Sequence, residues 1–379
     1  MKERDIHFMR LALAEAEKGL GRTAPNPCVG AVVVREDQVV GRGYHRRAGT
    51  PHAEVNAIRD AGTACRGATI YVTLEPCNHT GRTPPCTAAI LDAGIRRVVI
   101  GMKDPNPQVT GGGADYLRSQ GLEVSSGLLE EDCRRLNYPF LKHSTTGLPW
   151  VIMKAGMSLD ARISRQPGRG GAITGKESRQ FVHKLRDRTD AILIGSRTAL
   201  VDDPSLTTRL EKGRGRDPVR IVLDSRLRLS PGARMLGQES NAPTWIFASA
   251  DADADRAARL RDQGAVVVSM EVDEQGRLLL HPILEYLGRH DITSVLVEGG
   301  AAVHGSFLGQ GLVDQVFLFL APYFIGDQGV PLVSGYGCDV PGISCPQLEK
   351  ITLERLGRDI LLQGLLNTSW CRIRGQDAE

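Results

Sequence analysis

Short apolar segments with strand character alternate with helical segments along nearly the whole chain, and this alternation restricts the fold more than any other feature. Alternation of this kind is typical of layered α/β domains, in which helices cover a largely parallel sheet. In the first third of the chain, the pattern predicts strands at 29–34, 69–74 and 97–100 and helices at 8–16, 53–61 and 87–91. The glycines in the segment 41–43 predict a turn after the first of these strands.

A polar segment divides the chain. A helix predicted at 128–142 is followed by the polar run 143–147 and by Pro149, after which the alternation restarts. Further strands are predicted at 151–154, 191–194, 219–223, 244–248, 265–269, 294–297 and 316–320, and further helices at 178–186, 255–263, 282–289 and 302–308. At roughly 100–200 residues per domain, a chain of this length suits two domains. We therefore predict two α/β domains, 1–147 and 148–379.

The composition argues against a surface that coats nucleic acid. Lysine and arginine number 47 and aspartate and glutamate 44, which gives a net charge of +3, and aromatic residues make up only 5%. A nucleic-acid-binding face needs clustered cations and stacking aromatics. No apolar run reaches the roughly 20 residues of a membrane span, and the first residues lack the apolar segment of a secretory signal. We therefore expect a cytoplasmic protein whose eight cysteines are reduced.

The strongest local motif is His52-Ala53-Glu54, followed by Pro76-Cys77 and by Cys86. One imidazole and two thiolates make three zinc ligands and leave the fourth position for water, as catalytic zinc requires. Glu54 is placed to move protons rather than to bind the metal. Zinc deaminases use ligands and a glutamate in this order, with two residues between the cysteines. In this chain eight residues separate them.

The segment between the two cysteines adds polar groups beside the predicted metal site. It contains His79, Arg82 and Thr83, which we interpret as candidate substrate contacts. Two alternatives remain open: the cysteines are ordinary buried residues, or the zinc is structural and is closed by Cys65 or His79 as a fourth ligand. Cys28 lies outside the ligand pattern and is interpreted as a packed core thiol.

These motifs resemble the deaminase half of the bifunctional riboflavin-biosynthesis deaminase/reductase family. The matching segments are 23–31, 43–45, 52–54 and 75–86. The resemblance implies a cytidine-deaminase-like α/β/α domain that hydrolytically deaminates 2,5-diamino-6-(5-phosphoribosylamino)pyrimidin-4(3H)-one. Zinc would activate the attacking water, and Glu54 would carry its proton to the departing ammonia. The residues implied to contact the base or the ribose phosphate are Asn26, His45, His79 and Thr83, with Arg82 where many members have lysine.

The second half lacks the Gly-x-Gly-x-x-Gly fingerprint of common dinucleotide-binding folds. Instead, the apolar strand 295–297 continues through Glu298 into Gly299-Gly300 and a helix start. Backbone amides and the positive end of a helix dipole can bind a phosphate there, although paired glycines are also typical of plain turns. The segments 153–160, 173–175 and 195–204 place small and polar residues at strand-to-loop junctions, where clefts of α/β sheets form.

These segments resemble the reductase half of the same family, which has a dihydrofolate-reductase-like fold, so the resemblance covers nearly the whole chain. It implies that NADPH reduces the ribosyl group at C1′ to a ribityl chain. The residues implied to border NADPH are Met157, Ala172, Thr198, Asp202, Ser225, Gly300, Ala301, Ala302, Val303, His304, Gly305 and Ser306. The residues implied to line the substrate are Gly170, Arg186, Leu206, Arg209 and Glu298.

Arg186 and Arg209 suit a ribose phosphate, because guanidinium groups match phosphate oxygens; the alternative is that both are solvated surface charges. The chain departs from the family at two places. Members commonly have glycine where this chain has Ala161 and a bulkier residue where it has Ala172. No residue of this half has a proton-donor motif as clear as that of Glu54, so we expect reduction to depend mainly on positioning.

The sequence therefore predicts a homo-oligomeric, bifunctional enzyme that uses Zn²⁺ and NADPH and acts on a small pyrimidine ribosyl phosphate. One competing hypothesis is a nucleic-acid or nucleoside deaminase with a non-reductase C-terminal binding domain. Another is an inactive, zinc-stabilised scaffold. Several other conspicuous residues receive plain interpretations: the surface or helix histidines His7, His183, His281 and His290, and the unreactive cysteines Cys338 and Cys345.

Overall fold

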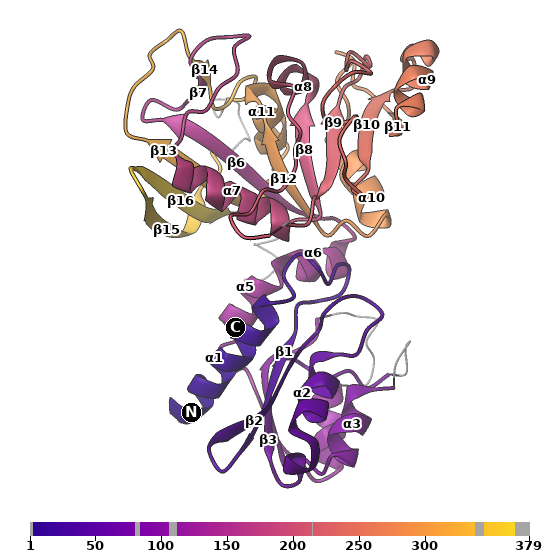
Figure 1. Cartoon of the computed structure of the whole chain (residues 1–379), viewed down its shortest axis with the longest axis vertical. Helices are drawn as coiled ribbons and strands as arrows, with labels where there is room; N and C mark the ends of the chain where they lie inside the picture. Colours follow the sequence, from indigo (N-terminus) through magenta and orange to yellow (C-terminus); the bar gives the residue numbers. More distant parts are fainter. Residues whose placement is uncertain (1–2, 80–83, 106–111, 214, 338–344, 368–379) are drawn as a thin grey trace. The chain divides into compact units, whose positions relative to one another are not determined.

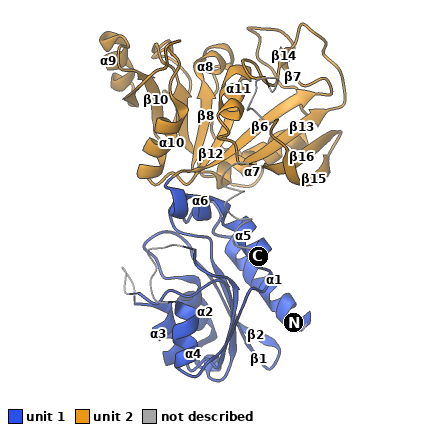
Figure 2. Ribbon diagram, turned by 180° about the vertical axis from the view of Figure 1, so that it is seen from behind, with its two compact units in different colours: residues 1–147 blue, residues 148–379 orange. Residues whose placement is uncertain are grey.

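The computed structural model describes residues 3–79, 84–105, 112–213, 215–337 and 345–367, so Arg82, Thr83 and Cys338 lie outside the described part of the chain. The chain separates into two compact units, Met1–Gly147 and Leu148–Glu379 (Figure 2). Each unit contains its own large sheet. Among the described residues, no helix is long and apolar enough to cross a membrane.

The N-terminal unit is a five-stranded sheet between helices, with α1 on one side and α2 and α3 on the other (Figure 1). The strand order is β2-β1-β3-β4-β5; β1 is antiparallel to β2 and β3, whereas β3, β4 and β5 are parallel. The strands are β1 (Gly30–Arg35), β2 (Gln38–Tyr44), β3 (Thr69–Leu74), β4 (Arg97–Met102) and β5 (Glu123–Ser126). The helices are α1 (Glu3–Glu17), α2 (Ala53–Ala61), the short 3₁₀ helix η1 (Gly62–Cys65), α3 (Cys86–Asp92), α4 (Gly113–Ser119), α5 (Glu130–Leu136) and α6 (Tyr138–Thr146).

The predicted turn at 41–43 is wrong, because these residues lie inside β2. A Cβ atom at Gly41 would lie 2.3 Å from the carbonyl oxygen of Ala57, and one at Gly43 would lie 2.3 Å from the backbone nitrogen of the same residue. Helix α2 therefore packs directly on the backbone of β2, and only glycine permits this approach. The chain turns earlier, at Glu36 and Asp37, where φ is 51° and 63°.

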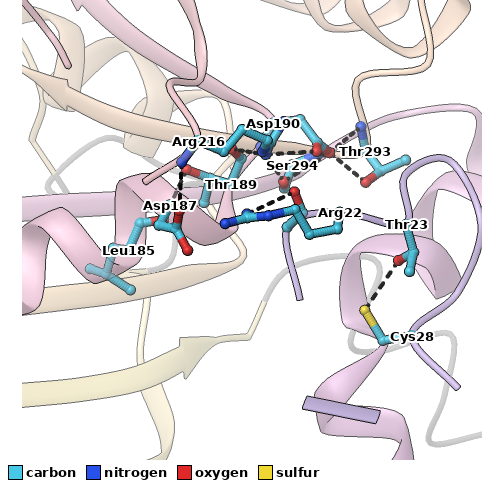
Figure 3. Close-up of polar contacts among 11 residues, drawn as sticks. Arg22, Thr23, Cys28, Leu185, Asp187, Thr189, Asp190, Arg216, Thr293 and Ser294 are labelled. Carbon is cyan, nitrogen blue, oxygen red and sulfur yellow. Dashed lines mark hydrogen bonds and ion pairs between the residues drawn. The ribbon is translucent and has the colours of Figure 1, made fainter. Parts of the chain in front are cut away.

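The single helix predicted at 128–142 is two helices, α5 and α6, with Asn137 between them. The Asn137 side chain accepts a hydrogen bond from the backbone N–H of Cys28 (2.7 Å) and donates one to the carbonyl oxygen of Cys28 (3.0 Å). Cys28 itself is buried, with its sulfur 3.2 Å from the Thr23 hydroxyl (Figure 3). Its interpretation as a core thiol is confirmed.

The C-terminal unit is built on a nine-stranded sheet with the order β11-β10-β9-β8-β12-β6-β13-β16-β15. The first seven strands in this order are parallel, and β16 and β15 are antiparallel to their neighbours. The strands are β6 (Trp150–Ser158), β8 (Ala191–Gly195), β9 (Val219–Leu223), β10 (Thr244–Ser249), β11 (Ala265–Met270), β12 (Ser294–Gly299), β13 (Gln315–Ala321), β15 (Leu348–Leu356) and β16 (Asp359–Leu366). A separate pair is formed by β7 (Arg162–Ser164) and β14 (Val330–Pro331). The helices are α7 (Lys176–Arg188), α8 (Ser196–Asp202), α9 (Ala254–Asp262), α10 (Leu280–Arg289) and α11 (Ala301–Gly309).

Two clusters of buried side chains stabilise this unit. One cluster includes Leu284 of α10 and Phe307 of α11, and the other includes Ala199 of α8 and Leu260 of α9. Both clusters contain side chains of the same parallel strands, so the centre of the sheet is buried on two faces. Such strands are continuous apolar runs in the sequence, which is why their positions were predictable.

Asp190 joins the beginnings of β8 and β12 (Figure 3). Its Oδ2 atom accepts hydrogen bonds from the backbone N–H groups of Thr293 (3.0 Å) and Ser294 (3.1 Å) and from both hydroxyl groups (2.7 and 3.0 Å). These contacts hold the two strands in register at their amino ends. The carboxyl ends of the same strands carry the residues of the second site described below.

Candidate active sites

The three predicted zinc ligands converge from different places in the N-terminal unit. His52 immediately precedes α2, Cys77 follows β3, and Cys86 is the first residue of α3. The Nδ1 atom of His52 and the two Sγ atoms all lie within 4.8 Å of one another. Nδ1 is 3.2 Å from Cys86 Sγ and 3.6 Å from Cys77 Sγ. One imidazole nitrogen and two sulfurs at this spacing fit a zinc ion with an open coordination position.

The alternative of a closed structural zinc site required a fourth ligand, and neither candidate joins the group. The thiol of Cys65 is buried and donates a hydrogen bond to the carbonyl oxygen of Ile58 at 3.6 Å. His79 is exposed. Within the described residues the group therefore has three members, as a catalytic zinc site requires.

The environment of Cys77 favours thiolate formation, whereas the hydrogen bond to Cys77 and burial raise the pKa of the Cys86 thiol. Hydrogen bonds donated by Cys86 and His52 lower the pKa of the Cys77 thiol to about 4, although burial opposes this shift. The backbone N–H of Cys86 also points at Cys77 Sγ, at 3.4 Å. Zinc binds the deprotonated sulfur, so the lowered pKa of Cys77 makes this thiol a better zinc ligand.

Glu54 lies in the first turn of α2 and is only 3% exposed. Burial raises the pKa of its carboxyl group, and the neighbouring His52 only partly opposes this effect. A carboxyl group with an elevated pKa takes up a proton more readily than an ordinary carboxyl group, as a general base in catalysis must. Its position two residues beyond a zinc ligand suits a proton carrier for the reaction at the metal.

Two of the predicted substrate contacts lie beside the metal ligands. Asn26 donates a hydrogen bond from Nδ2 to Nε2 of His45 (3.1 Å), and the rings of His45 and His52 have centroids 5.3 Å apart. Burial lowers the pKa of His45, so its ring is neutral. Within the described residues, no hydrogen bond or ring contact joins the exposed His79 to this group, and Arg82 and Thr83 are not described.

A cavity of about 740 Å³ lies in the C-terminal unit at the carboxyl-terminal parts of β6, β8 and β12. Most of the residues predicted to bind NADPH or substrate line it: Gly170, Ala172, Arg186, Thr198, Asp202, Arg209, Glu298, Gly300, Ala301, Ala302, Val303 and His304. The lining does not include Met157, Leu206, Ser225, Gly305 and Ser306. Five segments that are far apart in the sequence thus form one site.

An ion-pair network joins three elements at the base of this cavity. Glu298 accepts hydrogen bonds from Nε (2.7 Å) and Nη2 (2.8 Å) of Arg186 and from Nζ of Lys154 (3.1 Å). Burial alone would raise the pKa of Glu298, but the two cations hold it well below its usual range. Arg186 also donates to the carbonyl oxygen of Thr207 (3.0 Å), so it is not a solvated surface charge.

Arg209 differs from Arg186. Its side chain is exposed and lines the cavity, and no ion pair or hydrogen bond of its guanidinium group is found among the described residues. Its positive charge is therefore available to an anionic ligand in a way that the charge of Arg186 is not.

The start of α11 fits the phosphates of a dinucleotide. Gly300 precedes the helix with a φ of 83°, and no side chain caps the helix. A Cβ atom at Gly299 would lie 3.0 Å from the Cα of Ile194. Farther along the helix, Nδ1 of the buried His304 bonds to the carbonyl oxygen of Leu332 (3.2 Å), while Nε2 has no hydrogen-bond partner among the described residues. Free backbone amides and an unsatisfied buried nitrogen are typical of a site that is completed by a ligand.

Three small residues, Gly170, Ala161 and Ala172, lie in the loops near the cavity. A Cβ atom at Gly170 would lie 2.0 Å from Oδ1 of Asp202, so a larger residue at position 170 would require the Asp202 side chain to move. Burial raises the pKa of Asp202. Ala161, a position where the family resemblance implies glycine, adopts a φ of 56°, a conformation that L side chains rarely adopt. Ala172 is exposed in the cavity lining.

Sequence reasoning assigned no role to Lys154 or His183, which both line the cavity. Lys154 is a lysine inside an otherwise apolar strand, and such a residue needs an anionic partner when it is buried. His183 lies three residues before Arg186 on α7, a spacing that places both side chains on one face of the helix. These two patterns are the signals that could have identified them.

An open three-ligand zinc site with a buried glutamate in one α/β unit, and a dinucleotide-sized cavity in another, define a zinc deaminase fused to a reductase. Family comparisons agree with both halves. The cytidine and deoxycytidylate deaminase zinc-binding region matches residues 2–102, and the RibD C-terminal domain matches residues 149–362.

Similar proteins span the whole chain. The chain is 42% identical to the riboflavin biosynthesis protein RibD of Bacillus amyloliquefaciens over 95% of each sequence, and 40% identical to RibD of Escherichia coli K12 over 94% of this chain and 98% of that protein. Its structure resembles the diaminohydroxyphosphoribosylaminopyrimidine deaminase/5-amino-6-(5-phosphoribosylamino)uracil reductase of Thermotoga maritima, with a TM-score of 0.84, 38% identity and coverage of 96% and 99% of the two chains.

The chain belongs to the RibD family. It is a bifunctional deaminase/reductase of riboflavin biosynthesis, with a zinc-binding deaminase domain and a dihydrofolate-reductase-like domain of the NADPH-using kind. The predictions of fold class, enzyme type and cofactors are confirmed. The hypothesis of a non-reductase C-terminal binding domain is wrong, because the RibD C-terminal domain matches nearly all of that half.

Proposed function

We propose that the chain first deaminates 2,5-diamino-6-(5-phosphoribosylamino)pyrimidin-4(3H)-one and then reduces the ribosyl group of the product to ribityl. The similar protein of Thermotoga maritima is named for a deaminase and a reductase activity of this kind. The observation that carries the proposal is the convergence of His52, Cys77 and Cys86 beside the buried Glu54. We assign the first step to residues 1–147 and the second to residues 148–379.

In the first step, zinc, when bound, supplies an activated water. His52, Cys77 and Cys86 would hold the ion. Glu54 would take the proton of the water and pass it to the leaving ammonia, a role that its elevated pKa supports. Asn26 and the neutral His45 are linked by a hydrogen bond and would orient the pyrimidine beside the metal, with His79, Arg82 and Thr83 as further contacts.

In the second step, NADPH, when bound, supplies a hydride. The backbone amides of Ala301, Ala302 and Val303 at the start of α11 would hold its phosphates. Arg209 would bind the ribose phosphate, because its charge has no partner among the described residues. The remaining lining residues would border the cofactor (Ala172, Thr198, Asp202, Gly300 and His304) or the substrate (Gly170, Arg186 and Glu298).

Five residues of the predicted sites lie outside the cavity lining, and two of them, Leu206 and Gly305, would act through the backbone that they shape. Leu206 is buried with a φ of 53°, which shapes the loop that leads to Arg209. A Cβ atom at Gly305 would lie 2.0 Å from the carbonyl oxygen of Ser334, so this glycine lets α11 pack closely. Met157, Ser225 and Ser306 are proposed as neighbours of the cofactor on the resemblance alone.

Stepwise turnover tests the proposal. Ammonia release is measured first, with the diaminopyrimidinone ribosyl phosphate and no NADPH, and NADPH is then added while its absorbance is followed. We expect ammonia in the first stage and loss of absorbance only in the second. Absorbance loss without prior ammonia release would contradict the order, and absence of either signal would contradict the assignment of that unit.

We also propose that the chain forms homo-oligomers. β15 is an edge strand of the large sheet, and the side chains of Ile351 (54%) and Leu353 (69%) are exposed on it. Apolar edge strands are sites of pairing between chains. Light scattering after size-exclusion chromatography tests this, since Leu353→Lys would lower the molar mass only if this edge forms the contact.

A cytoplasmic location is our final proposal, since zinc binding at Cys77 and Cys86 requires reduced thiols. Cell fractionation tests it: recovery of the chain outside the cytoplasm with both thiols still reduced would contradict it.

A further inference from the structure

His183 lies on the cavity-facing side of α7 in the C-terminal unit, and the proposed reaction assigns it no role. It lines the same cavity as Arg186 and Arg209 and is partly buried. The other charged groups around His183 are Lys154 of β6 and Glu298 of β12.

The hydrogen bond of one ring nitrogen determines the tautomer of His183. The backbone N–H of Arg209 donates to Nδ1 at 3.2 Å. A backbone N–H can only donate, so Nδ1 carries no proton and the neutral ring is protonated at Nε2. Burial, followed by the charges of Arg186 and Arg209, lowers the pKa of His183 to about 4, which keeps the ring neutral at physiological pH.

Nε2 is therefore a hydrogen-bond donor, and it has no acceptor among the described residues. The guanidinium group of Arg209 on the bonded loop is likewise without a partner there, whereas Arg186 is fully engaged by Glu298 and Thr207. A cation and a neutral donor that line the same cavity, both without partners in the described part of the chain, suit an anion with several oxygens, such as a phosphate.

We propose that His183 is a substrate-binding residue of the reductase step, whose Nε2–H donates to an oxygen of the ribose phosphate held by Arg209. The inference rests on the proposed placement of that phosphate. The positive charge of Arg209 would attract the phosphate, and the Nε2–H of His183 would orient one of its oxygens. Because the hydrogen bond between the two residues fixes both the loop and the ring, the phosphate is bound in one orientation.

Two substitutions test the two ring nitrogens of His183 one at a time. In His183→Asn the amide oxygen can replace Nδ1 as the acceptor for Arg209, but the Nε2 donor is lost; in His183→Gln the amide nitrogen can replace Nε2. A hydrogen bond to a charged group corresponds to about tenfold in binding. We expect His183→Asn to raise the KM of the deaminated ribosyl phosphate about tenfold with little change in kcat, and His183→Gln to restore most of this loss.

Inorganic phosphate and the dephosphorylated substrate serve as probes of the contact itself. Inhibition by inorganic phosphate is expected to weaken about tenfold in His183→Asn, and the KM of the dephosphorylated substrate is expected to be the same in the variant and the parent. His281→Asn, an exposed histidine of α10, is the matched control, and chemical unfolding of the C-terminal unit reports that each variant is intact.

The results distinguish this inference from the function on which it rests. Unchanged KM and phosphate inhibition in His183→Asn, an equal loss in His183→Gln, or an equal penalty with the dephosphorylated substrate overturns the role of His183. If Arg209→Ala leaves the KM unchanged, the placement of the phosphate is overturned together with it. Loss of reduction with normal phosphate inhibition would locate His183 elsewhere in the reaction.

Discussion

The deaminase site and the cavity of the reductase unit are built in opposite ways. The chemically active side chains of the first come from residues 52–86, on the first turns of two helices and one loop. The second is assembled from β6, α7, β8, β12 and α11, whose residues span more than a hundred positions in the sequence. A metal site needs a few ligands of strict identity, whereas a cavity for a large cofactor and substrate needs a shape.

This difference determines how each site responds to change. At the zinc site, one side chain carries one step, so a conservative replacement is expected to stop that step alone. In the cavity, the charged side chains hold one another, so a replacement is expected to affect the fold of the unit as well as its reaction. Four predictions test this contrast.

The largest effect is expected from Glu54→Gln. The amide cannot carry the proton from water to ammonia, so deamination should fall about 10³-fold while zinc content stays the same. Ammonia release and metal analysis measure the two quantities. NADPH oxidation with the deaminated substrate should remain normal, and Glu17→Gln, at an exposed position of α1, should change nothing. If Glu54→Gln also lost NADPH oxidation, the two sites would not respond independently to substitution.

Glu298→Gln should destabilise the C-terminal unit by about 3 kcal/mol, because Arg186 and Lys154 would be left as buried cations without an anion. Chemical unfolding monitors stability, and NADPH oxidation should fall in the same variant. Glu285→Gln removes a carboxylate that pairs with His281 at the surface and should cost less than about 0.5 kcal/mol. Equal stability of the two variants would show that the network acts on substrate alone.

Asp5→Asn tests a buried carboxylate that has no part in either site. Hydrogen bonds donated by Arg97, and to a smaller extent by Tyr71, lower the pKa of Asp5 to about 2. A carboxyl group with a depressed folded-state pKa stabilises above its unfolded pKa and loses this contribution as the pH falls through the folded value. The variant should be about 2 kcal/mol less stable at pH 7, and the gap should narrow between about pH 4 and pH 2. A stability difference that is independent of pH would show that packing, and not charge, destabilises the variant. Ammonia release should persist in the variant.

The smallest effect is expected from Ala161→Gly. Glycine adopts the φ of 56° without the steric cost that alanine incurs, although it also loses more freedom on folding, so a net gain of about 0.5 kcal/mol is expected. The midpoint of thermal unfolding measures it. Ala258→Gly, at an exposed position of α9, should instead lower stability by about 1 kcal/mol. A loss in both variants would mean that the Ala161 turn is not strained.

The same contrast explains what the sequence could predict. The zinc ligands and Glu54 follow one another in a short motif, and the central strands are buried on both faces, so both leave strong local patterns. β15 was missed because it is exposed along most of its length and carries four charged residues. The attachment of Arg186 to Glu298 could not be predicted, since 112 positions separate the two residues and only the fold brings them together.

The direct contact of α2 with the backbone of β2 has an evolutionary consequence. No side chain lies between the two elements at Gly41 and Gly43 that could be exchanged for a larger or smaller one. Any substitution there would displace the helix that His52 immediately precedes and whose first turn carries Glu54. We therefore expect any other residue at these two positions to reduce deamination as well as stability, so that selection for the activity also acts on Gly41 and Gly43.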